Sequence, residues 1–123
     1  MDKMKAITFF DLDGTLLDGT SQITPEITAA VAALKDNQIL PLIATGRTLC
    51  EIQPIMKASG IDSAIVMNGQ FIHYEGKTIY SDEFTTEECV SLHEHVKQRG
   101  HELAFYNERR IFYRAYWHSE TSL

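Results

Sequence analysis

Two aspartates separated by a single residue could bind a metal ion near the start of the chain. Asp11 and Asp13 directly follow an apolar segment, Ala6–Phe10, that is typical of a β-strand. Side chains at positions i and i+2 of a strand share a face, so both carboxylates would point into the same space. That space lies at the carboxyl end of the strand, where open α/β sheets bind ligands. Close carboxylates repel each other, and a hard cation such as Mg²⁺ relieves the repulsion. With Gly14 turning the chain away, this spacing predicts a metal-assisted phosphate site.

Three short segments, in chain order, resemble motifs of one protein family. Residues 11–15 (DLDGT), after an apolar strand, resemble the first motif of the haloacid dehalogenase (HAD) superfamily. Residues 42–47 (LIATGR) end a second apolar strand and resemble the second motif. Residues 65–70 (IVMNGQ) are similar to the strand and Asn-Gly segment of the Cof-type phosphatase branch. The resemblance covers roughly the first seventy residues.

Two further motifs of the family have no counterpart in the sequence. Members of the family carry a lysine motif and an acidic cluster after their cap domain. Lys77 and Lys97 lie where the cap is expected, and no such acidic cluster occurs before Leu123. The resemblance therefore implies that the chain is truncated and corresponds to the N-terminal part of a Cof-type protein.

The resemblance assigns the chemistry to the two aspartates. Asp11 would be the nucleophile that takes the phosphoryl group, and an ionised aspartate needs no separate base for this step. Asp13 would be the acid that protonates the leaving alcohol and then the base that activates water. Both residues would be ligands of Mg²⁺. The alternative is a solvated Asp-Gly turn that follows a strand.

A second set of residues would bind the substrate phosphate. This set, implied by the resemblance, consists of Leu12, Thr45, Gly46, Arg47 and Asn68. The Thr45 hydroxyl would bind a phosphate oxygen, and the alternative for this threonine is helix capping. Gly46 would leave room for the substrate. Arg47 could pair with the phosphate or with a neighbouring carboxylate. Asn68 lies at the rim of the site in similar proteins, or is a plain turn residue.

The elements that must position these residues alternate between strands and helices. This order predicts a parallel sheet with crossover helices, and thus an α/β fold. Thr24 and Pro25 favour a helix start, and Gly60 favours a left-handed helix stop. Pro54 would kink the second helix or delay its start. The expected strands are 6–10, 39–44 and 64–67, and the expected helices are 25–37 and 49–58.

The pattern changes after residue 69. Residues 71–74 and 77–81 flank Glu75-Gly76, which predicts a hairpin. Residues 85–88 (TTEE) form a capping box that opens a helix ending at Gly100. Two more strands are expected at 102–106 and 109–113. This arrangement resembles the start of the αβ cap domain of Cof-type enzymes.

The resemblance implies two domains. The expected division is a partial HAD-like Rossmannoid core over 1–82 and a partial cap over 83–123. The aromatic residues Tyr113, Tyr116 and Trp117 could line a substrate pocket in this cap or pack against its strands.

Composition limits the possible partners. The chain has 17 acidic and 11 basic residues, a formal charge of −6. This balance argues against nucleic acid and against a membrane surface, which would favour a basic patch. The two cysteines, Cys50 and Cys89, form no Cys-x-x-Cys pair. With no membrane-length apolar stretch and no signal-peptide pattern, the expected location is the cytoplasm.

The family function that the resemblance implies is Mg²⁺-dependent hydrolysis of a small phosphorylated metabolite, a phosphate monoester such as a sugar phosphate or nucleotide. Phosphomutase activity is one alternative. Another is an inactive fragment that only binds metal, phosphate or a partner. In the family, further core strands lie beyond the first strand. Without them, residues 6–10 would form an uncovered apolar edge through which the chain could self-associate.

Overall fold

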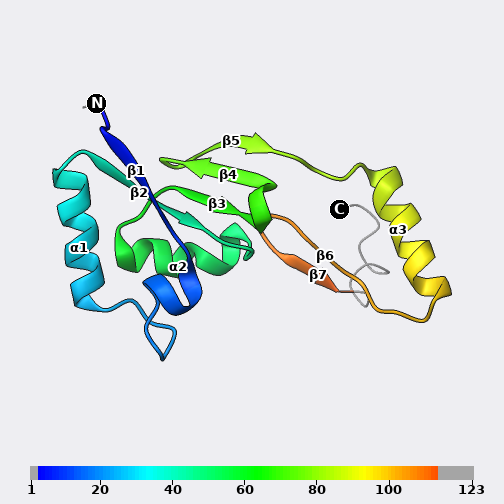
Figure 1. Ribbon diagram of the computed structural model, residues 1–123. Helices are drawn as coiled ribbons and strands as arrows, with labels where there is room; N and C mark the ends of the chain where they lie inside the picture. The colour runs from blue at the N-terminus through cyan, green and yellow to red at the C-terminus, as the bar shows by residue number, and fades with distance from the viewer. Residues whose placement is uncertain (1–2, 114–123) are drawn as a thin grey trace.

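The computed structural model describes residues 3–113 and contains a five-stranded mixed sheet (Figure 1). Strands β1 to β3 are parallel, whereas β3, β4 and β5 are antiparallel neighbours. The strand order is β1-β2-β3-β4-β5. This confirms the predicted α/β fold and the five strands predicted before residue 82, with the third one residue shorter than predicted. The strands are β1 (Ala6–Phe10), β2 (Ile39–Ala44), β3 (Ala64–Val66), β4 (Phe71–Tyr74) and β5 (Lys77–Ser81).

Two helices cover the same face of the sheet. Helix α1 (Pro25–Asp36) connects β1 to β2, and α2 (Leu49–Ser59) connects β2 to β3. Because successive parallel strands step in one direction with right-handed crossovers, the two helices must lie side by side. They contact each other and are neighbours in Figure 1.

The ends of these helices follow their local sequence signals. The Thr24 hydroxyl accepts a hydrogen bond from the Ile27 N–H at 3.3 Å, so Thr24 is the N-cap of α1 as predicted. Gly60 ends α2 in the left-handed conformation, at φ 82°. Helix α2 begins at Leu49 as predicted, with Pro54 inside it, so the proline does not delay the start of the helix. One turn of helix thus forms before the proline.

The hydrophobic core lies between the sheet and these helices. Leu12 belongs to it, so the chain is anchored in the core immediately after β1, between the two aspartates. The core side chains with at most 1% exposure are Leu12, Ile43, Ile52, Ile61, Ala64 and Val66.

After the β4–β5 hairpin, which belongs to the sheet, the rest of the described chain extends away from the sheet. At the β4–β5 turn, Glu75 and Gly76 both have positive φ, 46° and 83°, as a two-residue hairpin turn requires. Helix α3 (Thr86–Gln98) opens with the predicted capping box between Thr85 and Glu88. It lies beyond the end of the sheet (Figure 1).

A separate antiparallel pair, β6 (Ala104–Tyr106) and β7 (Ile111–Tyr113), follows α3. Both strands begin two residues later than predicted, at Ala104 and at Ile111. The predicted division at 82/83 stays a prediction, and Tyr116 and Trp117 lie outside the described residues. Within residues 3–113, no helix is long and apolar enough to cross a bilayer.

Substitution of Ile43 should show how strongly the core supports the fold. Ile43 on β2 is fully buried, so Ile43→Ala should lower the free energy of unfolding by about 2–5 kcal/mol. Ile79→Ala on β5 removes the same atoms from a side chain that is 61% exposed, and should change stability by less than about 0.5 kcal/mol. Urea unfolding monitored by circular dichroism measures both values. Equal losses for the two variants would contradict this location of the core.

Candidate functional site

The two aspartates flank the start of a tight turn after β1. The turn covers Leu12–Leu16 and is closed by backbone hydrogen bonds that span five residues. The Leu16 N–H donates to the Asp11 carbonyl at 3.2 Å, and the Leu17 N–H donates to the Leu12 carbonyl at 3.0 Å. Gly14 has φ 76°, a conformation that costs other residues energy. The turn therefore depends on this glycine.

The pattern of exposure in the turn directs both carboxylates to one side. Asp11 and Asp13 are exposed, whereas Leu12 between them is fully buried. The Asp11 carboxylate accepts a hydrogen bond from the Leu12 N–H at 2.9 Å. The backbone N–H of Leu12, part of the predicted phosphate-binding set, is thus already held by Asp11.

A second tight turn follows β2. The Thr45 N–H donates to the Ile65 carbonyl of β3 at 2.9 Å, and the Thr45 hydroxyl accepts from the Arg47 N–H at 3.1 Å. Thr45 therefore closes the turn and does not cap α2. The N-cap of α2 is Thr48, whose N–H donates to the Glu51 carboxylate at 3.2 Å.

An ion pair joins the two turns. Arg47 Nη2 lies 2.7 Å from Asp13 Oδ1, and the two side chains are 35% and 66% exposed. Of the two partners that the sequence left open for Arg47, the structure shows the carboxylate, and that carboxylate is Asp13. Because both groups are partly solvated, water screens the pair, and its main effect is to fix geometry.

The loop after β3 is hydrogen-bonded to the turn after β2. The Met67 N–H donates to the Arg47 carbonyl at 2.9 Å, and the Asn68 N–H donates to the Thr45 carbonyl at 3.2 Å. These bonds hold both residues at positive φ, 51° and 55°. The Asn68 amide fills the space beside Gly46, where an added Cβ would lie 3.0 Å from Asn68 Oδ1. Gly46 thus leaves room for the Asn68 side chain, and the room expected there for substrate stays a prediction.

Each of the seven predicted site residues directly contacts another member of the set: Asp11 with Leu12, Asp13 with Arg47, Thr45 with Arg47, and Gly46 with Asn68. Thr45 is linked to Asn68 through the backbone. Among the residues described, no hydrogen bond joins Asp11 to the turn after β2. The catalytic and binding roles of all seven residues stay predictions.

The oxygen atoms of Asp11 and Asp13 are of the type that binds a hard cation, but they are few. Carboxylate and carbonyl oxygens are the ligands that Mg²⁺ prefers. Within residues 3–113, however, no group of three or more Asp, Glu, His or Cys side chains is placed to hold a metal ion. Asp11 and Asp13 alone should therefore bind Mg²⁺ weakly.

Sequence analysis did not single out two residues near these turns. Asp18, which is exposed, accepts hydrogen bonds from the Thr20 hydroxyl, the Gln22 N–H and the Thr20 N–H. In that order of size, these bonds lower the pKa of Asp18, and they order the loop that leaves the turn. Thr48, which caps α2, is 2% exposed. Its T-x-x-E pattern with Glu51 is a capping box that the sequence already displays.

The fold and the site together define an α/β protein with an acidic turn at the carboxyl end of its first parallel strand. A family model described as haloacid dehalogenase-like hydrolase matches residues 8–122. The chain belongs to this family.

Relatives and solved structures agree with this membership. YkrA of Bacillus subtilis strain 168, a candidate phosphatase by name, is 31% identical over 102 residues, which cover 83% of this chain and 40% of YkrA. A protein from Geobacillus kaustophilus has a similar structure, with a TM-score of 0.79 and 35% identity over 88% of this chain and 42% of its own. The sugar phosphatase BT4131 has a TM-score of 0.67 and 28% identity over 88% and 43%. The chain thus spans less than half the length of each.

Substitution of Gly14 should test the conformational demand of the turn. Gly14 has φ 76°, and a Cβ added there would meet no atom within 4 Å. Gly14→Ala should therefore cost about 1–2 kcal/mol of stability through backbone strain alone. Gly19 has equally open surroundings without a left-handed φ, so Gly19→Ala should not destabilise. Thermal unfolding of both variants measures the difference. Equal stabilities would show that the turn does not need a left-handed residue.

Proposed function

We propose that the protein carrying this chain hydrolyses small phosphate monoesters, such as sugar phosphates, with the help of Mg²⁺. One observation carries the proposal. The turn after β1, with Asp11 and Asp13, is joined to the turn after β2 by the 2.7 Å contact between Asp13 and Arg47. Carboxylates for phosphoryl transfer and a guanidinium that can pair with phosphate thus lie together at the carboxyl ends of the parallel strands.

In the proposed reaction, a carboxylate oxygen of Asp11 attacks phosphorus and the bond to the ester oxygen breaks. Asp13 gives its proton to the departing alkoxide, which leaves as an alcohol. Asp13 then takes a proton from water, and the resulting hydroxide attacks the phosphorus of the aspartyl-phosphate. Inorganic phosphate is released and the Asp11 carboxylate is restored.

The remaining residues would hold the phosphoryl group during these steps. The Thr45 hydroxyl and the Leu12 N–H can donate to phosphate oxygens, and Asn68 lies at the rim. The Leu12 N–H donates to the Asp11 carboxylate in the structure, so substrate would replace Asp11 there, whereas the Thr45 hydroxyl accepts from the Arg47 N–H and can still donate its own hydrogen. Arg47 would likewise be shared between Asp13 and the phosphate, as a guanidinium with several donors allows.

Asp11 and Asp13 are the residues that would hold Mg²⁺, Asp11 through its carboxylate and Asp13 through its backbone carbonyl. When bound, the ion would neutralise negative charge on the phosphoryl group. Asp11 can then approach an anionic phosphate more easily.

The comparisons support this proposal by analogy. Structural similarity extends to the sugar phosphatase BT4131, and an HMP-PP phosphatase of Serratia proteamaculans is 33% identical over 79 residues, which cover 64% of this chain and 27% of the relative. We propose the cytoplasm as the location.

The alternative of a phosphomutase would yield an isomer and no free phosphate. The alternative of an inactive chain that only binds ligands follows from the two-carboxylate donor set among the described residues.

Asparagine substitutions should separate the two aspartates by role. In the full-length protein that carries this chain, assayed with p-nitrophenyl phosphate and Mg²⁺, Asp11→Asn should abolish phosphate release, because an amide cannot form the aspartyl-phosphate. Asp13→Asn should lower the rate about 10²–10⁴-fold, because proton transfer is lost. Asp36→Asn, at an exposed position in α1, is the matched control and should retain full activity. Phosphate release measures all three. Full turnover by Asp11→Asn would remove it as the nucleophile.

We also propose that this 123-residue chain, taken alone, self-associates through β1, with activity far below that of intact relatives. The outer edge of β1 has no strand partner among the residues described, and Ile7 and Phe9 on it are 52% and 57% exposed. A parallel sheet with an apolar open edge favours pairing with another chain.

A charge on this edge should prevent the association. Phe9→Lys should shift the chain toward monomer, because a lysine on an edge strand opposes strand pairing. Ile79→Lys places the same charge on β5 at the opposite edge and should leave the association unchanged. Sedimentation velocity over a range of concentrations measures the effect. A parent chain that is monomeric at all concentrations would contradict the proposal.

A further inference from the structure

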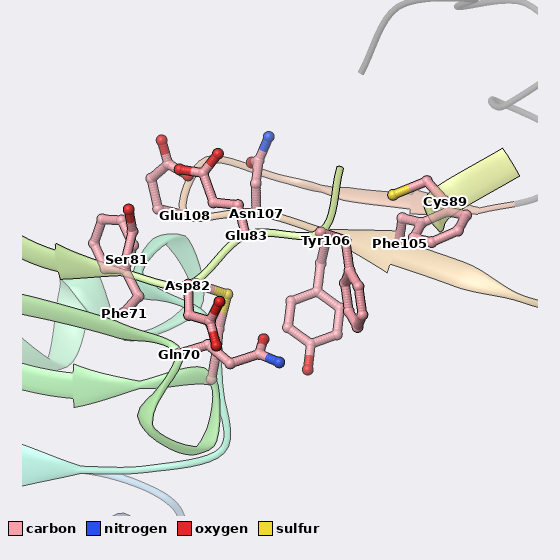
Figure 2. Close-up of a pocket in the computed structure, with 12 residues that line it drawn as sticks. Gln70, Phe71, Ser81, Asp82, Glu83, Cys89, Phe105, Tyr106, Asn107 and Glu108 are labelled. Carbon is pink, nitrogen blue, oxygen red and sulfur yellow. The ribbon is translucent and has the colours of Figure 1, made fainter. Parts of the chain in front are cut away.

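A hollow of about 280 Å³ lies between the sheet and the segment that follows α3. Three stretches of chain form its walls: the loop after β3 with the start of β4 (67–71), the connection from β5 towards α3 (81–84), and the end of β6 with the following turn (105–108). Figure 2 shows these stretches around a common space. Its volume is at the small end of the range for ligand pockets.

The hollow shares a wall with the candidate active site. Met67 and Gln70 line it at one end, and between them in the same loop Asn68 lies beside Gly46. The carbonyl of Gln70 accepts a hydrogen bond from the Asp82 N–H at 2.8 Å, which fixes the far wall to this loop. A molecule whose phosphate lay at the turn with Thr45 and Arg47 could therefore extend its organic part toward the hollow.

Part of the lining is aromatic and uncharged. Phe71, Phe105 and Tyr106 contribute rings, and the Tyr106 ring extends toward the side chain of Gln70 (Figure 2). Burial raises the pKa of the Cys89 thiol, which also lines the hollow, so it stays in the neutral form. Such walls suit the apolar faces of a ring-shaped organic group.

The charged part of the lining is acidic, beside the neutral polar residues Gln70, Ser81 and Asn107. Asp82, Glu83 and Glu108 line the hollow, and none of the twelve lining residues is a lysine, arginine or histidine. Glu108 also faces the exposed Arg109, with 3.8 Å between Glu108 Oε1 and Arg109 Nε. Ionised carboxylates accept hydrogen bonds and donate none, so they suit hydroxyl groups and repel anions.

We infer that this hollow binds the organic part of the substrate and selects neutral, hydroxyl-rich groups over groups that carry a second negative charge. The inference rests on the proposed phosphatase function and adds to it a charge rule set by the carboxylates of Asp82 and Glu83. A hydroxyl donates to these carboxylates, whereas a second anionic group on the substrate meets like charges.

Two substrates that differ in one charged group test this rule. Glucose 6-phosphate has a neutral organic part, and 6-phosphogluconate has a carboxylate on a similar carbon chain. The purified full-length protein that carries this chain, with Mg²⁺, should show a kcat/KM for glucose 6-phosphate at least about tenfold higher than for 6-phosphogluconate. p-Nitrophenyl phosphate reports on the phosphate site separately.

Removal of the acidic charges should weaken the preference. The double variant Asp82→Asn/Glu83→Gln keeps the side-chain shapes, and it should shrink the ratio of the two kcat/KM values about fivefold. The matched control, Glu87→Gln/Glu94→Gln, removes two exposed charges from α3 outside the hollow and should leave the ratio unchanged. In the parent, raising the ionic strength from about 0.05 M to about 0.5 M should also shrink the ratio, because salt screens the repulsion.

The outcomes separate this inference from the proposed function. Turnover of p-nitrophenyl phosphate with equal kcat/KM for glucose 6-phosphate and 6-phosphogluconate, or a ratio that the hollow variant and the control change equally, would overturn the charge rule alone. Absence of any p-nitrophenyl phosphate turnover would overturn the phosphatase function and, with it, this inference.

Discussion

The site depends on the burial of one side chain, that of Leu12. It is fully buried in the core beneath the turn, whereas Asp11 and Asp13 on either side are exposed. Burial of a leucine contributes about 2 kcal/mol, and a rotation that buried either carboxylate would lose this energy and desolvate a charge. The hydrophobic core thus holds the acidic pair outward. Gly14 completes the constraint, because only a residue that tolerates positive φ lets the chain leave the turn in this direction.

The second constraint is the hydrogen bonding between the loops after β2 and β3. Backbone bonds from Met67 and Asn68 to the turn that contains Thr45 and Arg47 make the two loops one unit. They also hold two successive non-glycine residues at positive φ, which costs energy that the bonds offset. Because the Arg47 side chain reaches Asp13, this unit is connected to the turn after β1. Three loops that are distant in sequence therefore form one rim at the carboxyl edge of the sheet.

Much of the fold could be predicted from the sequence because its signals are local. Thr24 with Pro25 marks a helix start, Glu75-Gly76 marks a hairpin turn, and each strand lies in an apolar run. The conformation of Met67 could not be predicted, since it depends on a hydrogen bond to Arg47, twenty positions earlier in the sequence. The third strand was predicted to include Met67 because Met67 continues the apolar run, whereas β3 ends at Val66. The capping box at Thr48, in contrast, was present in the sequence and was overlooked in favour of Thr45.

Charge is distributed unevenly across the rim, and this asymmetry would orient a bound substrate. Arg47 is at the end near Asp11 and Asp13, where its guanidinium faces a carboxylate and remains 35% exposed. The hollow at the other end is lined with Asp82, Glu83 and no basic residue. A phosphate monoester is strongly charged at one end only, so it would be attracted by its phosphate to Arg47 and repelled if it entered in the reverse direction. Under our proposals, a chain with a formal charge of −6 can thus still bind a phosphate, provided that the rest of the molecule is neutral.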